Sequence, residues 1–277
     1  MKHTLRLTDY RIEEINEIFH IADELQEGKY KGFLTGKTIV MFFPSSSLRT
    51  RITFEKGIYL LGGQTILFPT ETLDKKEKTE DVVKYLNNWA EGAIIRHKSI
   101  VLLEEIAEYA EFPVINAMTD CNHPCEMLSD LYALSKRRRD FTKDKFLFVG
   151  AKGNIGLALK EAADLMGLSL LQSCPAGYEL EGVEVIRDLK KAVQNIDVIC
   201  TDSLPHNALQ DFENYQITSD LIKLANDDCI LNLCPPFYRG EEVSAEVIES
   251  PHFAGYEFKK NLLEVQQAII IYNMTHS

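Results

Sequence analysis

The sequence predicts an α/β protein with two domains, each a doubly wound parallel sheet with helices on both faces. Short apolar runs of strand length alternate with longer amphipathic or charged segments, as they do in β-α-β units. Two of these runs lead into helix-like patterns through turns rich in hydroxyl groups or glycine. The chain has 277 residues, of which 45 % are hydrophobic, so it can bury two cores of ordinary size. A cationic stretch at 136–139 marks the expected boundary between a first domain at 1–135 and a second at 140–257.

The first half carries the alternation of helices and strands that a parallel sheet needs. Apolar residues between 12 and 25 recur at steps of three or four, which predicts an amphipathic helix. Gly62-Gly63 ends a later helix, because glycine tolerates the left-handed backbone that closes helices. The expected strands lie at 38–43, 64–68, 93–95 and 112–117, and the other helices at 52–59, 82–89 and 127–135.

The second half repeats this pattern, with one feature that suggests a different ligand. The loop Gly150-Ala-Lys-Gly-Asn-Ile-Gly156 joins an expected strand at 145–149 to a helix that ends at residue 166. Such a turn can hold the pyrophosphate of a dinucleotide. Its spacing is G-x-x-G-x-x-G rather than G-x-G-x-x-G, and no acid follows the next strand, so dinucleotide binding is the weaker alternative. Further strands are expected at 169–171, 183–187 and 197–201, and a C-terminal helix at 258–274.

The stretch Pro44-Ser-Ser-Ser-Leu-Arg-Thr-Arg51 has the composition of an anion site. It lies between an expected strand and the start of a helix, where unpaired N–H groups and the helix dipole favour negative charge. Ser46 or Ser47 is expected to cap the helix, Thr50 adds a hydroxyl group, and Arg49 and Arg51 add forked donors suited to phosphate. A capped surface helix with two solvated arginines is the ordinary alternative.

Two later positions point towards the same kind of pocket. Arg96 follows the expected strand at 93–95, and ligands of open α/β sheets bind at the carboxyl ends of strands. His123 precedes a helix and lies between Cys121 and Cys125. A zinc site is not favoured, because no second Cys/His cluster accompanies this one, and we expect no metal.

Composition restricts the classes of partner. The formal net charge of −12 argues against nucleic acid, whose phosphates need a basic surface. Six scattered cysteines are typical of reduced thiols in a cytoplasmic protein. Neither a signal-peptide pattern nor an apolar run of membrane-spanning length is present, so we expect a soluble cytoplasmic protein without a membrane partner.

The segment 47–51 resembles the Ser-x-Arg-Thr-Arg phosphate-binding signature of the aspartate/ornithine carbamoyltransferases. Later segments match the same family in order, and the resemblance covers nearly the whole chain. They are Ile95-Arg96, His123-Pro-Cys-Glu126 and the stretch from Cys234 to Val243, which contains Arg239-Gly-Glu-Glu. The resemblance implies a homotrimer or a multiple of trimers, and a C-terminal helix, at 258–277, that returns to the first domain.

The resemblance also implies a role for each matched residue. Carbamoyl phosphate would be bound by Ser47, the backbone of Leu48, Arg49, Thr50 and Arg96, with Arg51 in support, and its carbonyl polarised by Arg96 and His123. Glu126, Cys234 and Pro235 would orient the carbamoyl NH2 group, with the Cys234 thiol near the attacking amine. Asn154, Asp202, His206 and Asn207 would bind the amino-acid acceptor, and Lys75 or Lys76 would reach the active site of the neighbouring subunit. Neither a metal nor an organic cofactor is required, because carbamoyl phosphate is already activated.

Several departures from the family pattern leave the acceptor open. Glu126 replaces a glutamine, Leu233 a histidine, Leu262 an arginine, and His206-Asn207 a Ser-Met pair. Asp202, Cys234 and the block at 239–243 nevertheless lie closer to the ornithine branch, so L-ornithine, giving L-citrulline and phosphate, is the favoured acceptor. Aspartate, an N-acylated ornithine or another amine remains an alternative, as does a weakened paralogue that binds a ligand as a regulator.

Overall fold

The computed structural model describes residues 1–276, which form two compact units. Unit 1 comprises Met1–Ala133 together with the C-terminal residues from Lys260 onward, and unit 2 comprises Leu134–Lys259. Each unit contains one wholly parallel sheet with helices on both faces, so the predicted fold class is confirmed. None of the helices within residues 1–276 is both long enough and apolar enough to cross a membrane.

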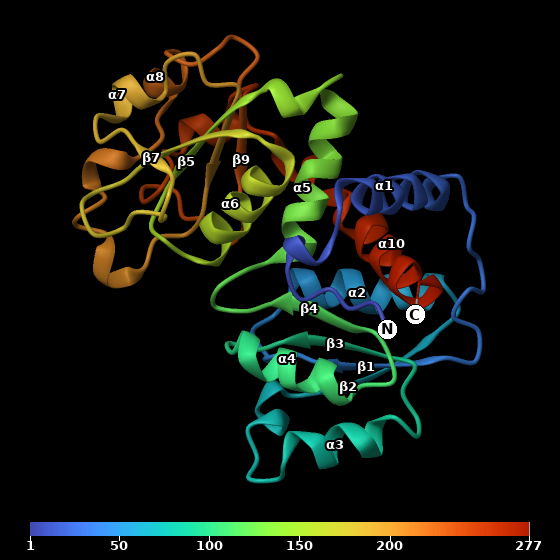
Figure 1. Ribbon diagram of the computed structural model, residues 1–277. Helices are drawn as coiled ribbons and strands as arrows, with labels where there is room; N and C mark the ends of the chain where they lie inside the picture. Colours follow the sequence, from blue (N-terminus) through green and yellow to red (C-terminus); the bar gives the residue numbers. More distant parts are fainter. Residues whose placement is uncertain (277) are drawn as a thin grey trace. The chain divides into compact units, whose positions relative to one another are not determined.

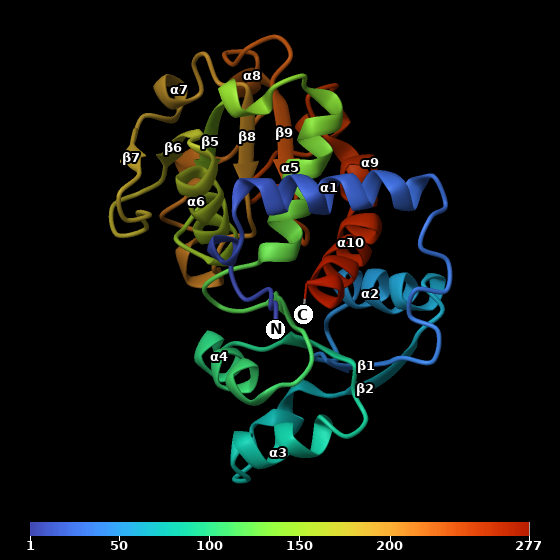
Figure 2. The same ribbon diagram turned by 45° about the vertical axis from the view of Figure 1, so that its right-hand side comes forward.

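The sheet of unit 1 has the strand order β2-β1-β3-β4. Figures 1 and 2 show α3 and α4 on one face of this sheet and α1, α2 and α10 on the other. Its strands are β1 (Thr38–Phe42), β2 (Gln64–Phe68), β3 (Gly92–Arg96) and β4 (Val114–Met118). Its helices are α1 (Ile12–Gln26), α2 (Arg49–Leu60), α3 (Thr79–Leu86), α4 (Ile100–Tyr109), α5 (Pro124–Arg137), which runs into unit 2, and α10 (Leu262–Thr275).

The alternation of side chains along β1 explains why both faces are covered. Val40 and Phe42 belong to a buried cluster that includes Val83 of α3 and Leu103 of α4. Ile39, one position out of phase, lies on the opposite face with residues of α10. Successive strand residues point to opposite faces, so a strand that is apolar throughout requires helices on both.

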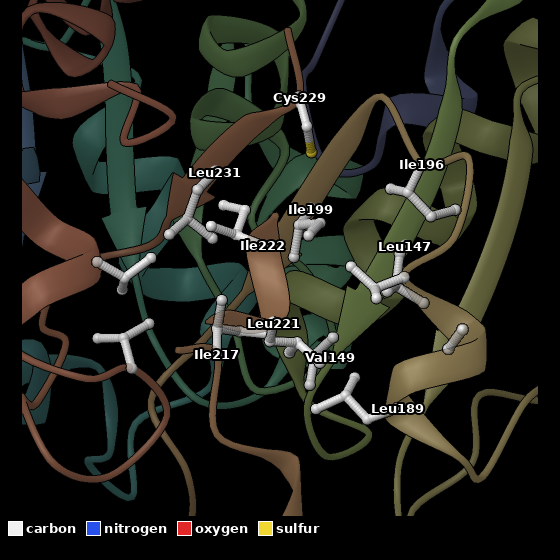
Figure 3. Close-up of a cluster of buried hydrophobic side chains, with 14 of the residues drawn as sticks. Leu147, Val149, Leu189, Ile196, Ile199, Ile217, Leu221, Ile222, Cys229 and Leu231 are labelled. Carbon is white, nitrogen blue, oxygen red and sulfur yellow. The ribbon is translucent and has the colours of Figure 1, made fainter. Parts of the chain in front are cut away.

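The sheet of unit 2 has the order β7-β6-β5-β8-β9. A buried cluster joins Leu147 of β5, Ile199 of β8 and Leu231 of β9 to Leu189 of α7 and Leu221 of α8 (Figure 3). The strands are β5 (Lys145–Val149), β6 (Ser169–Ser173), β7 (Glu184–Val185), β8 (Val198–Thr201) and β9 (Ile230–Leu233). The helices are α6 (Asn154–Met166), α7 (Leu189–Ala192), α8 (Ser219–Ile222) and α9 (Gly255–Lys260).

The C-terminal helix corrects one prediction and confirms another. A single helix was expected at 258–274, but the chain forms α9 and α10, which meet at Asn261. Asn261 keeps helical dihedral angles, with φ −65° and ψ −10°, so the backbone stays close to helical where α9 ends and α10 begins. Helix α10 packs against α1 and α2 of unit 1, as the resemblance implied.

Candidate functional site

The carboxyl ends of β1, β3 and β4 lie along one edge of the unit 1 sheet. The register pairs Phe42 of β1 with Ile95 of β3, and Arg96 with Met118 of β4. The predicted phosphate stretch follows β1, Arg96 ends β3, and the His123 segment follows β4. Parallel strands bring these three segments to the same edge, which is where ligands of such sheets bind.

Arg96 and Ser47, 49 residues apart in the sequence, are in direct contact. The Nη1 atom of Arg96 donates a hydrogen bond of 3.1 Å to Oγ of Ser47. Ser47 and Thr50 are buried, with 4 % and 5 % of their surface exposed, whereas Leu48 and Arg49 are exposed. Arg49 forms no side-chain hydrogen bond or ion pair within residues 1–276, so its guanidinium is available to an anion.

The serine-capped helix predicted here is wrong. Helix α2 begins at Arg49 rather than at residue 52, and its N-cap is Leu48, which makes no side-chain capping bond. The backbone N–H of Ser47 donates to Pro44 O in a turn, and the Ser47 hydroxyl accepts from Arg96 instead of a helix N–H. A charged donor competes well for that hydroxyl, and the N–H groups of the first helical turn therefore have no serine partner.

Asn122 holds the loop that leads through His123 into helix α5, whose first turn contains Glu126. Its Oδ1 accepts 2.7 Å hydrogen bonds from Thr119 Oγ1 and Asn116 Nδ2, and its Nδ2 donates to Leu5 O at 3.1 Å. His123 is the residue immediately before α5, Glu126 lies in the first turn of that helix, and both are 5 % exposed. Sequence reasoning missed Asn122, because its role depends on side-chain and backbone contacts with Asn116 and with Leu5, and Leu5 is 117 residues away in the chain.

Cys125, between His123 and Glu126, is fully buried and donates from Sγ to Asn116 O at 3.4 Å. Burial, together with the charge of Glu126, raises the pKa of this thiol well above its usual range. A thiol in this state is a poor metal ligand, since metals bind the thiolate. Among the described residues, no three His, Cys, Asp or Glu side chains gather as metal ligands would.

Lys75 and Lys76 are exposed in the loop before α3. This loop begins with the short 3-10 helix η2 (Thr70–Leu73). Arg51, expected to support the site, forms an ion pair with Glu55 of the same helix, with 2.8 Å between Nε and Oε1.

The predicted acceptor residues of unit 2 also follow the carboxyl ends of strands. Val149 of β5, Thr201 of β8 and Leu233 of β9 are aligned in register. Asn154 is the first residue of α6, Asp202 directly follows β8, and Cys234 directly follows β9. Because β5, β8 and β9 are neighbours, these three positions lie at one edge of the sheet.

Hydrogen bonds fix the backbone around two of these positions. The N–H of Cys234 donates to Thr201 O at 3.1 Å, and the N–H of Ser203 donates to Oδ1 of Asp202 at 2.8 Å. The peptide bond between Pro235 and Pro236 is cis. His206 and Asn207 are exposed in a separate 3-10 helix, η4 (His206–Ala208).

Glu242 is a residue of this region that sequence reasoning missed. Only 2 % of its surface is exposed, and Oε1 accepts a 2.6 Å hydrogen bond from the N–H of Tyr238. Its Oε2 is buried without a hydrogen-bond partner among the described residues. Burial, with the nearby charges of Glu241 and Asp202, raises the pKa of Glu242 to about 7. The block Arg239-Gly-Glu-Glu-Val243 was noted in the sequence, but nothing there distinguishes the buried glutamate from its half-buried neighbour, Glu241.

The glycine-rich loop has a packing explanation that needs no dinucleotide. A Cβ atom on Gly150 or Gly156 would lie 2.9 Å or 2.7 Å from the ring of Phe148, so both positions are restricted to glycine. Gln172, near the end of the next strand, β6, donates from Nε2 to Gly150 O and Tyr178 O and accepts at Oε1 from Leu180 N. The position where a dinucleotide fold places its ribose-binding acid is therefore occupied by an amide that holds backbone.

Comparison with known proteins places both halves of the chain in one family. Residues 2–136 match the carbamoyl-phosphate-binding domain of the aspartate/ornithine carbamoyltransferases, and residues 143–273 match the Asp/Orn-binding domain of the same family. The ornithine carbamoyltransferase of Geobacter metallireducens is 33 % identical over 296 residues, covering 97 % of this chain and 98 % of the relative. That of Syntrophus aciditrophicus is 34 % identical over 296 residues, with the same coverage of each chain. The structure of the Pyrococcus furiosus ornithine carbamoyltransferase is 29 % identical, with a TM-score of 0.94 over 100 % of this chain and 98 % of that one.

Proposed function

Because the chain belongs to the aspartate/ornithine carbamoyltransferase family, we propose that it transfers the carbamoyl group of carbamoyl phosphate to L-ornithine, giving L-citrulline and phosphate. The observation that carries this proposal is the match of both domains, in order, with named ornithine carbamoyltransferases similar along almost the whole chain. These matches do not favour the dinucleotide or regulator alternatives. We further propose that residues 1–135 and 258–277 serve carbamoyl phosphate, and that residues 140–257 serve the acceptor.

In this proposal, the phosphate group binds at the start of α2. Ser47, the backbone N–H of Leu48, Arg49 and Thr50 surround it, and Arg96 approaches from β3. Support comes from the contact between Arg96 and Ser47 and from the unengaged guanidinium of Arg49. Two forked donors beside a helix N-terminus suit a doubly charged phosphate.

Carbonyl activation is assigned to Arg96 and His123, which would stabilise the negative charge that grows on the carbamoyl oxygen during attack. Glu126, Cys234 and Pro235 would orient the NH2 group. Positioning and charge stabilisation would supply most of the rate, because carbamoyl phosphate already carries its leaving group.

The acceptor would be held by Asn154, Asp202, His206 and Asn207. Asp202 is the best supported of these, since it directly follows the carboxyl end of β8 and a carboxylate can pair with an ammonium group. His206 and Asn207 are exposed, so they are available to contact a ligand side chain. The acceptor amine must be neutral when it attacks, and the Cys234 thiol would lie near it.

We also propose a homotrimer, or a multiple of trimers, in the cytoplasm, in which Lys75 or Lys76 reaches the neighbouring active site. The exposure of both lysines supports a contact with a neighbouring subunit. The six free cysteines of the described chain support a cytoplasmic location. Size-exclusion chromatography with light scattering tests the assembly.

The decisive assay follows ureido product from carbamoyl phosphate and a panel of amines that includes ornithine, N-acetylornithine and aspartate. Ornithine is expected to give citrulline fastest, and absence of product with every amine would overturn the proposal.

Arg96→Lys is expected to raise KM for carbamoyl phosphate by about 10-fold or more, because lysine lacks the forked guanidinium that can bind Ser47 and phosphate together. Arg11→Lys, at a position where the side chain is 78 % exposed, is the matched control and should leave KM unchanged.

A further inference from the structure

The segment Thr70–Asp74 is fastened at both ends to the dipeptide Arg96-His97. At one end, Thr70 Oγ1 donates a 2.7 Å hydrogen bond to the carbonyl oxygen of Arg96. At the other, Oδ1 of Asp74 lies 3.1 Å from Nε2 of His97. The dipeptide that contains a proposed phosphate-binding arginine therefore also holds the base of the loop that carries Lys75 and Lys76.

The tautomer of His97 follows from its surroundings. The backbone N–H of Ser99 donates to Nδ1 of His97 at 3.0 Å, so Nδ1 presents a lone pair and the ring proton is on Nε2. Nε2–H therefore donates to the Asp74 carboxylate. The His97 side chain is 3 % exposed, and its backbone N–H donates to Met118 O of β4 at 3.1 Å. His97 is thus fixed by the sheet. It holds Asp74, whose side chain is 48 % exposed, in place.

Apolar packing beneath the loop is incomplete. A cavity of about 20 Å³ lies there, lined by Leu73 and Lys75 of this segment and by Phe42, Val83 and Ile95. A gap of this kind removes van der Waals contacts that would otherwise hold the loop in place. Lys75 and Lys76 form no hydrogen bond or ion pair within residues 1–276. Leu73 packs against the buried cluster that contains Val40 and Phe42, and the two polar contacts to Arg96-His97 add to this attachment of the loop.

We propose that His97 and Asp74 are positioning residues for carbamoyl phosphate binding. Their hydrogen bond orders the loop that carries Lys75 and Lys76 and couples it to the strand end at Arg96. The proposal rests on the function proposed above and extends it. Without this bond, the loop must be ordered when the substrate binds, and that cost appears as weaker binding of carbamoyl phosphate rather than slower chemistry.

Asp74→Ala tests the proposal with little risk to folding, because Asp74 is an exposed loop residue. Asp74→Asn keeps an acceptor for Nε2–H and should restore most of the effect. Glu71→Ala is the matched control, since it removes one negative charge from the same short loop at an exposed position whose side chain forms no hydrogen bond or ion pair within residues 1–276. Each variant is studied as the full-length assembled protein.

Two readouts separate a positioning role from a merely structural one. Trypsin cleavage after Lys75, Lys76 and Lys78 reports opening of the loop and should be faster in Asp74→Ala. The KM for carbamoyl phosphate, and its Kd by calorimetry, should rise about 10-fold with kcat changed by about two-fold or less. Asp74→Asn should lie within about three-fold of the wild type, and Glu71→Ala should match it.

Unchanged cleavage and unchanged affinity in Asp74→Ala would overturn the proposal, as would an equal effect in Glu71→Ala. A fall in kcat alone would also count against it, because ordering of the loop acts on binding. If the wild-type protein forms no product with any amine, the proposed function fails. The cleavage and calorimetry comparisons still decide the role of the His97–Asp74 pair in that case.

Discussion

At the scale of single residues, Glu242 places a buried carboxyl group near Asp202. Its pKa is raised from the ordinary 4.5 to about 7, so the folded protein holds this proton at a pH where the unfolded chain has released it. Stability from this group is therefore complete below about pH 4.5 and is lost as the pH rises to about 7. The carboxylate form is buried and leaves Oε2 without a hydrogen-bond partner among the described residues, so the pKa of Glu242 is raised rather than lowered.

Glu242→Gln should remove that pH dependence, because the amide stays neutral and still accepts from Tyr238 N. Relative to the wild type, the variant should gain on the order of 2 kcal/mol in free energy of unfolding between pH 5 and pH 8. Urea denaturation at both pH values measures the gain. Glu241→Gln is the control and should show no such difference; an equal gain there would contradict the assignment to Glu242.

At this scale, the sequence can point to residues whose proposed role depends on their chemical type, but it misses contacts that depend on a partner elsewhere in the fold. Arg96 was singled out because it ends an expected strand and matches the Ile-Arg of the family that the chain resembles. Ser47 was assigned to the helix N-terminus, but its hydroxyl group accepts from Arg96, a choice that only the folded sheet reveals. Asn122, His97 and Asp74 were missed for the same reason, since each is defined by contacts across the fold.

At the scale of elements, the crossing of α2 and α10 depends on Gly57. A Cβ atom there would lie 2.9 Å from Cγ of Gln267, and Nε2 of Gln267 donates to Gly57 O at 3.0 Å. Helix propensity alone favours alanine over glycine by about 1 kcal/mol. The close approach of the buried Gln267 side chain opposes this preference, because a buried neighbour cannot shift freely.

Gly57→Ala should therefore lower the free energy of unfolding by about 1–2 kcal/mol, against its helix propensity. In a Gln267→Ala background, where the obstructing side chain is absent, the same substitution should be neutral or stabilising by up to about 1 kcal/mol. Chemical denaturation of the four proteins in this double-mutant cycle measures both effects. Equal effects of Gly57→Ala in the two backgrounds would show that Gln267 is not the cause.

Elements with a clear pattern were predicted well, and those with a mixed pattern were not. Strands β2 and β5 have the expected bounds, because turn residues or charges flank their apolar runs. Helix α4 has no counterpart among the predicted elements. It begins with four consecutive apolar residues, of which Leu103 is buried and Val101 is 66 % exposed, so the helical period is hidden. The short helices α7 and α8, of four residues each, are below the length at which periodicity is visible.

At the scale of the whole molecule, unit 1 is discontinuous in sequence. Its N-terminal segment pairs beside β4 through Thr4 and Ile115, and Nδ2 of Asn273 in α10 donates to Oγ1 of the buried Thr4 at 2.6 Å. Helix α10 also covers α1 and α2 and is buried along most of its length. The division into two α/β domains was predictable from alternation and length, whereas this closure required the family resemblance.

A chain that ends at residue 260 lacks α10 and should fail to form unit 1. The apolar surfaces of α1 and α2 would be exposed to water, which costs a free energy of about 25 cal/mol per Å² of apolar area. The truncated protein should aggregate, or should show fast proteolysis within residues 1–133 while residues 134–259 resist, as measured by limited digestion and mass spectrometry. A soluble product whose first 133 residues are as resistant as in the full chain would contradict this expectation.

The late position of α10 has a consequence for biosynthesis. A ribosome synthesises residues 134–259 before it synthesises α10, so all of unit 2 has been made before unit 1 is complete. Residues 1–133 cannot complete unit 1 until α10 leaves the exit tunnel, and the apolar faces of α1 and α2 stay exposed until then. During translation, unit 2 can therefore fold ahead of the unit that precedes it in the gene.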